Sequence, residues 1–173
     1  MERKAHMTDM TARRILAIDA GTTESGYCFM DTETYKPLMF GKVGNGELLT
    51  LVREGCYDAL VFEAFASYGM SIGASTITSI EWNGRFIEAA DALGKPFYRI
   101  YRREEKLCLC GSMKAKDTNI RQALIDRFAQ FDFKNGKGTK TNRDIFYGFH
   151  SDIFTAFAVG TVWIDKQKGV WEE

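Results

Sequence analysis

Three short apolar segments near the beginning of the chain constrain its fold more than any other feature. They cover residues 15–20, 26–31 and 38–43, with Gly21 after the first and a turn over residues 32–37 before the third. Each has the length of a β-strand and is too short for a typical helix. Because the links between them are short, we expect an antiparallel meander of three strands.

The rest of the chain alternates between helical and strand patterns. Residues 58–63 (DALVFE) and 97–101 are the fourth and fifth predicted strands. Asn45 is placed to cap a short helix that runs through residue 53. The other expected helices cover residues 75–93, residues 103–110 before Gly111, a segment capped by Asp117 or Thr118, and a final segment from Ser151 or Asp152 to about residue 166.

This order of elements predicts an α/β fold with a mixed five-stranded sheet, in which the meander is joined by two parallel strands and flanked by helices. A chain of 173 residues suits one domain of ordinary size. We place that domain at residues 14–167, after a disordered leader (residues 1–13) and before a short tail (residues 168–173). Residues 132–148 form a glycine- and lysine-rich loop.

The sequence excludes several broad classes. No apolar segment approaches the roughly 18 residues of a membrane helix, and the N-terminus lacks the apolar stretch of a signal peptide. We therefore expect a cytoplasmic protein with no membrane partner. The four cysteines, Cys28, Cys56, Cys108 and Cys110, have no histidine pair beside them, which favours reduced and mostly buried thiols over a zinc site or a disulfide framework.

Charge is distributed unevenly although the net charge is zero. Residues 1–94 carry five more acidic than basic side chains, residues 95–143 carry eight more basic than acidic, and residues 144–173 again carry three more acidic. A cationic surface separate from a group of carboxylates suits a metal-dependent nuclease, because the carboxylates bind metal and the cations bind phosphate. The alternative is a solvated basic face with no partner.

Three acidic residues occupy informative positions. Asp19 and Glu63 end the first and fourth predicted strands, and Asp152 opens the last helix after a polar loop. If those two strands are neighbours, Asp19 and Glu63 meet at one sheet edge, and the last helix must cross that edge to bring Asp152 to them. Taken singly, each has an ordinary interpretation: a turn residue, a surface charge and a helix cap.

Crowded carboxylates repel one another and raise each other's pKa. Hard, oxygen-preferring cations such as Mg²⁺ or Mn²⁺ relieve that cost. Two such ions about 4 Å apart can activate water and stabilise the leaving oxygen in phosphodiester cleavage. Together the three acids therefore predict a two-metal nuclease site.

Four segments resemble the RuvC family of Holliday junction resolvases, in particular the RuvC-like proteins of phages and prophages. They are IDAGTTESGY, VFEAF, REEKLCLCGSMKAKDTNIRQALIDRF and HSDIFTAFAVG, and the resemblance covers roughly residues 14–165. It implies a ribonuclease-H-like fold, a homodimer in the bacterial cytoplasm, and nicking of four-way or other branched DNA with two Mg²⁺ or Mn²⁺ ions. Asp19, Glu63 and Asp152 match three of the family's metal-binding acids.

The chain departs from the family near the fourth metal-site residue. The family has an acid or a histidine three residues before the last aspartate, where this chain has Phe149. His150, one residue later, is a candidate catalytic residue, with an unremarkable loop histidine as the alternative. Asp144 is a weaker substitute.

The resemblance also implies DNA-binding residues. Arg103, Lys106, Lys114 and Lys116 lie in the segment that resembles the family's DNA-contacting region, where basic side chains neutralise phosphates. Tyr68 follows Glu63 closely and is a candidate for stacking on an unpaired base. Phe65 is expected in the core.

Two other functions fit parts of the sequence. The run Asp-Ala-Gly-Thr-Thr also resembles the first phosphate motif of the sugar-kinase, actin and Hsp70 superfamily, although no second glycine-rich phosphate turn is present between residues 60 and 165. The departure at Phe149 allows an inactive DNA-binding module of the same fold. Both alternatives stay open on the sequence alone.

Overall fold

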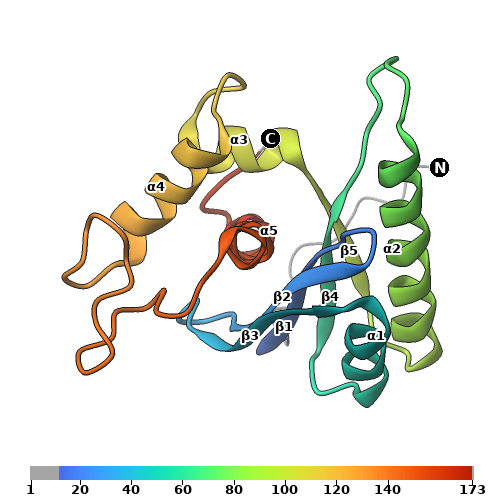
Figure 1. Ribbon diagram of the computed structural model, residues 1–173, viewed down its shortest axis with the longest axis horizontal. Coiled ribbons are helices and arrows are strands. Elements are labelled where there is room, and N and C mark those ends of the chain that lie inside the picture. Colours follow the sequence, from blue (N-terminus) through green and yellow to red (C-terminus); the bar gives the residue numbers. More distant parts are fainter. Residues whose placement is uncertain (1–11, 173) are drawn as a thin grey trace.

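The computed structural model describes residues 12–172, and within them five strands form one mixed sheet in the order β3-β2-β1-β4-β5 (Figure 1). Strand β1 pairs antiparallel with β2, as β2 does with β3, and β4 pairs parallel with both β1 and β5. The predicted meander with two parallel strands is confirmed. The bounds are β1 (Arg14–Asp19), β2 (Glu24–Asp31), β3 (Pro37–Gly44), β4 (Ala59–Ala64) and β5 (Phe97–Tyr101).

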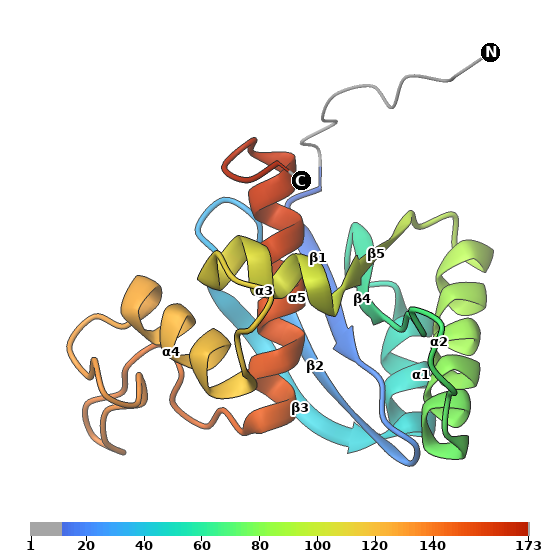
Figure 2. The same ribbon diagram turned by 90° about the horizontal axis from the view of Figure 1, so that it is seen from above.

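Helices cover both faces of this sheet. One face carries the first two helices, and the other carries the last helix with the remaining two beside it (Figures 1 and 2). Every predicted helix is present, with small differences at its ends. They are α1 (Asn45–Glu54), α2 (Ala74–Ala92), α3 (Arg102–Cys110), α4 (Asp117–Phe128) and α5 (Ser151–Gln167).

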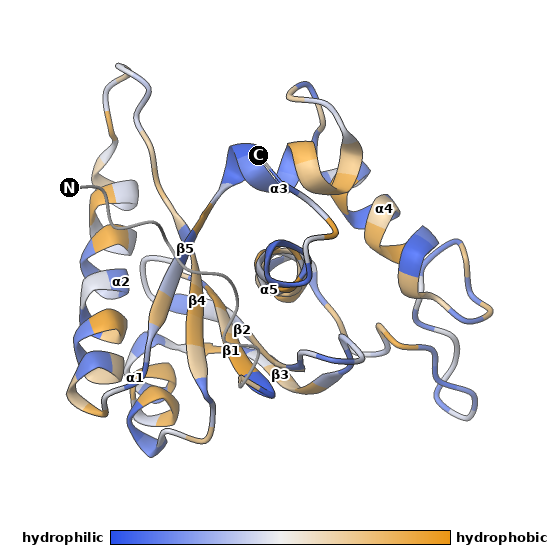
Figure 3. Ribbon diagram, turned by 180° about the vertical axis from the view of Figure 1, so that it is seen from behind, coloured by the Kyte–Doolittle hydropathy of each residue, from blue (hydrophilic) through white to orange (hydrophobic). Residues whose placement is uncertain are grey.

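The alternation of side chains along β1 explains its continuous apolar sequence. Ile15 and Ala17 lie in the core cluster that includes α5, whereas Leu16 and Ile18 lie in the cluster formed with α1 and α2. A strand that is buried on both faces has no polar alternation. Figure 3 shows the hydrophobic colour along β1 and β4 in the middle of the sheet.

Helix α5 lies against the sheet at one glycine. A Cβ atom added to Gly160 would lie 2.3 Å from Sδ of Met30 and 3.1 Å from Cβ of Ala17. The helix axis can approach the strands this closely only because position 160 has no side chain. This contact sets the height of α5 above β1 and β2.

Two predicted helix caps are wrong. Asn45 is the first residue of α1 after the N-cap Gly44, and its side chain accepts a hydrogen bond from Ser25 Oγ (2.5 Å) and donates one to Gly21 O (3.0 Å). Asp117 is likewise the first residue of α4 and forms an ion pair with Arg102. In both cases a tertiary partner competes with the local N–H groups for the side chain.

Several expectations about exposure need correction. All four cysteines are free, but only Cys28 is buried; Cys56 is exposed in the link between α1 and β4. Phe65 is 37% exposed, because β4 has ended one residue before it. No helix within residues 12–172 has the length and apolar character that crossing a membrane requires. The expected leader lies outside the described residues except for its end, where the N–H of Arg13 donates to Asp58 Oδ2 (2.9 Å).

Candidate active site

Asp19 and Glu63 meet at the carboxyl ends of two neighbouring strands. Strands β1 and β4 are parallel, and Ile18 lies beside Phe62 in their register, so the next residue of each strand lies at the same sheet edge. The two carboxyl groups lie close enough that Glu63 raises the pKa of Asp19. Neighbouring carboxyl groups are stabilised when one of them is protonated or when a cation binds between them.

A tight turn follows Asp19 and forms one wall of a pocket. A Cβ atom on Gly21 would lie 2.1 Å from the carbonyl oxygen of Glu24, so the turn requires glycine. The N–H of Gly21 donates to Ser25 Oγ (3.1 Å), which in turn donates to Asn45. The pocket has a volume of about 200 Å³ and is lined by Asp19, Gly21, Thr22, Thr23, Glu24, Lys42 and Asp152.

Asp152 reaches this pocket because α5 begins against a glycine of β2. Gly26 pairs with Asp19 across the β1–β2 register. A Cβ atom on Gly26 would lie 2.4 Å from the backbone oxygen and 2.9 Å from Cβ of Asp152. The missing side chain at position 26 therefore allows the first turn of α5 to lie beside Asp19. The carboxylate of Asp152 forms an ion pair with Lys42 (Oδ2 to Nζ, 2.7 Å).

The carboxyl groups at this edge perturb one another. Burial, followed by the charges of Glu63 and Asp152, raises the pKa of Asp19 to about 8. Burial also raises the pKa of Glu63, an effect that the nearby Arg102 guanidinium opposes. Asp19 is therefore close enough to both Glu63 and Asp152 to interact with them electrostatically, and added positive charge beside Asp19 would be stabilised.

This coupling predicts how stability depends on pH in the absence of metal. The pKa of Asp19 is about 8 in the folded protein and near 4 in an unfolded chain. Its protonated form therefore contributes stability that is complete below the unfolded value and is lost as the pH rises through about 8. In EDTA, chemical denaturation should show the free energy of unfolding of the wild type falling by up to about 1.4 kcal/mol per pH unit relative to Asp19→Asn. Equal pH profiles for the two proteins would contradict the raised pKa.

The donor set of this edge fits a hard divalent cation. Asp19, Glu63 and Asp152 offer only oxygen atoms, which Mg²⁺ and Mn²⁺ prefer, and the raised pKa of Asp19 marks a site short of positive charge. In their present positions, no three His, Cys, Asp or Glu side chains within residues 12–172 lie close enough together to bind one metal ion. The geometry gives the reason, because Asp19 contacts Glu63 directly while Asp152 is turned to Lys42.

One charged residue of this region, Glu105, was not predicted as a site residue from the sequence. Glu105 of α3 is fully buried, its Oε2 accepts a hydrogen bond from Arg102, and its Oε1 has no partner. Burial and the charge of Glu63 raise its pKa well above the ordinary value. The position of Glu105 in the chain could have indicated its role, because α3 begins directly at the carboxyl end of β5, the strand next to β4.

The candidates for the fourth metal-site residue have different surroundings. Phe149 is fully buried and its ring packs against Phe40, Phe146, Phe154 and Phe157. His150 is exposed at the N-cap of α5, two residues from Asp152. Asp144 instead holds the loop that follows α4, because its oxygens accept the backbone N–H groups of Gln130, Phe131, Asp132 and Ile145. These hydrogen bonds hold the pKa of Asp144 near 2, against the effect of burial.

The predicted DNA-binding residues lie along the neighbouring surface. Lys114 and Lys116 are exposed between α3 and α4, and Lys106 is half-buried on α3. Tyr68 is 66% exposed, has a positive φ of 46°, and lines a pocket of about 250 Å³ together with Glu63 and Arg102. Arg103 lines an adjoining pocket that also includes Tyr68. The aromatic ring and one of the three acids, Glu63, therefore line the same pocket.

Comparison with known proteins finds similarity in structure but none in sequence. No model of a protein family matches the chain, and no curated protein sequence matches it either. The "Thermus thermophilus RuvC structure" aligns with a TM-score of 0.65 at 15% identity, covering 90% of this chain and 96% of that one. The same protein "in complex with Holliday junction substrate" aligns with a TM-score of 0.67 at 16% identity, covering 91% and 96%.

A yeast protein is also similar. The "Yeast Mitochondrial Holliday Junction Resolvase, Ydc2" aligns with a TM-score of 0.59 at 12% identity, covering 91% of this chain and 81% of that one. The alignments cover 90–91% of this chain, so they include the whole five-stranded sheet and the helices on both of its faces. The chain therefore has the ribonuclease-H-like fold in the form found in RuvC.

Proposed function

We propose that this protein is a metal-dependent endonuclease that nicks four-way or other branched DNA. The observation that carries the proposal is the contact between Asp19 and Glu63, with Asp152 beside them, at the carboxyl ends of β1 and β4. Structural similarity to Holliday junction resolvases supports DNA as the substrate. The proposed setting is the bacterial cytoplasm during phage or prophage activity.

In the proposed mechanism Asp19, Glu63 and Asp152 would hold Mg²⁺ or Mn²⁺. Two such ions would activate the attacking water and stabilise the leaving oxygen of the scissile phosphodiester. A cation bound by Asp152 would compete with its ion pair to Lys42, whose ammonium group would then be free to neutralise charge on DNA. His150, exposed beside the first turn of α5, orients the attacking water. Arg103, Lys106, Lys114 and Lys116 bind backbone phosphates, and Tyr68 stacks on a base at the branch point.

The proposed assembly is a homodimer. Ile77 and Ile80 of α2 are 48% and 40% exposed, so this helix presents apolar side chains away from the sheet. A two-fold dimer through α2 would match a junction with two equivalent strands to cut.

The direct test is a cleavage assay on a four-way junction, a flap and a linear duplex of the same sequence. We expect nicking of the branched substrates with Mg²⁺ or Mn²⁺ and none in EDTA. Binding to junctions without cleavage under either metal would favour an inactive module of the same fold. If nucleotide instead stabilises the protein against heat and junctions do not bind, the phosphate-motif alternative gains support.

Lys116 provides a prediction about DNA affinity. Its side chain is exposed at the N-cap of α4. Substitution by alanine should weaken junction binding and reduce the slope of log K against log salt by about one, as expected for the loss of one phosphate contact. Binding titrations at several salt concentrations measure this slope, and an unchanged slope would exclude the contact.

A further inference from the structure

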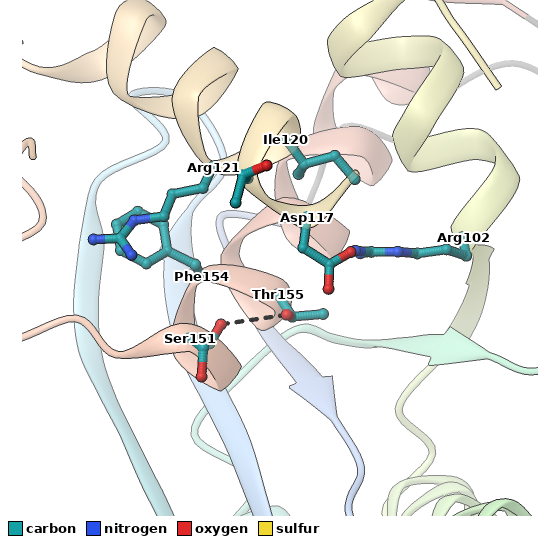
Figure 4. Close-up of a pocket in the computed structure, with 8 residues that line it drawn as sticks. Arg102, Asp117, Ile120, Arg121, Ser151, Phe154 and Thr155 are labelled. Atoms are coloured by element: carbon teal, nitrogen blue, oxygen red, sulfur yellow. Dashed lines mark hydrogen bonds and ion pairs between the residues drawn. The ribbon is translucent and has the colours of Figure 1, made fainter. Parts of the chain in front are cut away.

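A separate pocket, also lined by Arg102, lies between the first turns of α4 and α5 (Figure 4). It has a volume of about 180 Å³, enough for a phosphate group and water. Its polar lining consists of Arg102, Asp117, Thr118, Arg121, Ser151 and Thr155. The proposed nuclease mechanism leaves this pocket without a role.

Arg121 contributes a positive charge to the pocket. Its guanidinium lies over the ring of Phe154, 4.7 Å from the centroid, and Figure 4 shows the two side chains stacked at one end of the pocket. Among residues 12–172 no carboxylate lies within ion-pair distance of it. A stacked arginine is preorganised, so it loses little side-chain entropy when it binds an anion.

Arg102 is held in place at the opposite end. Its Nη1 donates to the buried carboxylate of Glu105, and its Nη2 pairs with Asp117. The side chain of Asp117 is 88% exposed, so its carboxylate can turn to solvent when a competing anion arrives. The lining then presents two guanidinium groups, and the buried Glu105 keeps one of them in position.

Hydroxyl groups and backbone N–H groups complete the lining. Thr118 belongs to the first turn of α4, whereas Ser151 and Thr155 come from the first turns of α5. No side chain caps the N-terminus of α5. The Thr155 hydroxyl donates to the Ser151 carbonyl (3.3 Å; Figure 4), and Thr118 also lines the pocket. Two helix N-termini add their partial positive charge to that of the arginines.

We propose that this pocket binds one backbone phosphate of the DNA strand, next to the phosphodiester at the acids. The proposal rests on the nuclease function proposed above. Arg102 lines both this pocket and the one that contains Glu63, so the two sites share a wall. A strand with one phosphate at the acids can therefore place a neighbouring phosphate between Arg102 and Arg121. Such a contact fixes the position of the strand and carries no base preference.

The test asks whether the Arg121 side chain contacts one particular phosphate of the junction. Four-way junctions are prepared with a single neutral methylphosphonate at successive positions around the cleavage site. With wild-type protein we expect one position outside the scissile phosphate to weaken binding by about tenfold, the loss of one charge-assisted contact. Arg121→Gln, which keeps packing over Phe154, should weaken binding of the unmodified junction by a similar factor and lose sensitivity at that position alone.

Two further variants sharpen the test. Arg53→Gln removes an exposed arginine from α1 on the opposite face of the sheet, and it should retain the wild-type pattern. Asp117→Asn removes the competing carboxylate, and it should tighten binding without shifting the sensitive position. Thermal melts of all variants show whether each is folded.

The outcomes separate this proposal from the nuclease function. A wild type that neither binds nor cuts junctions overturns the function itself. If the wild type cuts junctions but Arg121→Gln keeps the full methylphosphonate pattern, the pocket is not a DNA phosphate site. If inorganic phosphate raises the melting temperature of the wild type alone, while no methylphosphonate position depends on Arg121, the pocket takes a free anion and the proposal fails.

Discussion

Replacing Asp19 by asparagine is expected to reduce cleavage of a four-way junction by at least about a hundredfold, since even residues that only support a metal ligand typically matter by 10- to 100-fold. The substitution keeps the shape of the side chain but removes the carboxylate that would bind metal beside Glu63 and Asp152. Junction binding should persist, because the side chains proposed to bind backbone phosphates are unchanged. Single-turnover cleavage and equilibrium binding at the same salt concentration measure the two effects separately.

Asp58→Asn is a suitable control for this experiment. Asp58 precedes β4 at the other end of the sheet, and its Oδ2 accepts the N–H groups of Arg13 and Arg14, which an asparagine oxygen can also accept. Its cleavage rate should match the wild type. If Asp19→Asn cuts junctions as well as Asp58→Asn does, Asp19 is not a metal ligand and the proposed mechanism is wrong.

The antiparallel meander and the two parallel strands were predictable because local patterns and general connection rules agree in the first hundred residues, whereas the pairing of β1 with β4 was only assumed. The short links between β1, β2 and β3 allow little besides a meander, and the helices on either side of β4 suit parallel pairing. The position of an acid after each apolar strand then indicated where Asp19 and Glu63 would lie. Once β1 and β4 are neighbours, their meeting follows from register alone.

The charged neighbours of these acids could not be predicted in the same way. Glu105 lies in a helix whose sequence, RREEKLCLC, is mostly polar and suggests solvent exposure. Its burial depends on the angle at which α3 leaves β5, a tertiary property that helical periodicity does not contain. The caps failed for the related reason that Asn45 and Asp117 found partners distant in sequence, Ser25 and Arg102.

Two glycines affect the geometry of the site more than the sequence indicated. Gly26 lies in the segment IDAGTTESGY, which resembles the RuvC family, but only the structure shows that its lack of a side chain leaves room for the backbone of Asp152. The same argument applies to Gly160, where α5 lies against Met30 and Ala17. The position of α5, and with it the third acid, therefore depends on two residues that have no functional group.

Gly26→Ala should consequently damage both the fold and the site. The new methyl group would lie 2.4 Å from the backbone oxygen of Asp152, so the first turn of α5 must move away from β2. Such overpacking typically costs about 1–3 kcal/mol of stability. A displacement of Asp152 by about 1 Å can reduce the cleavage rate by about a hundredfold. Chemical denaturation and single-turnover cleavage, measured below the melting temperature of the variant, give the two numbers.

Gly46→Ala is the matched control, because it also adds one methyl group to a glycine with negative φ but meets no atom within 4 Å. Within α1 it should leave cleavage unchanged and raise stability by up to about 1 kcal/mol. The comparison separates the effect of the position from the effect of the added methyl group, which should be harmless in open space and harmful between β2 and α5. If Gly26→Ala retained wild-type stability and cleavage, α5 could not be held against β2 at that point, and Asp152 would have no fixed place beside Asp19.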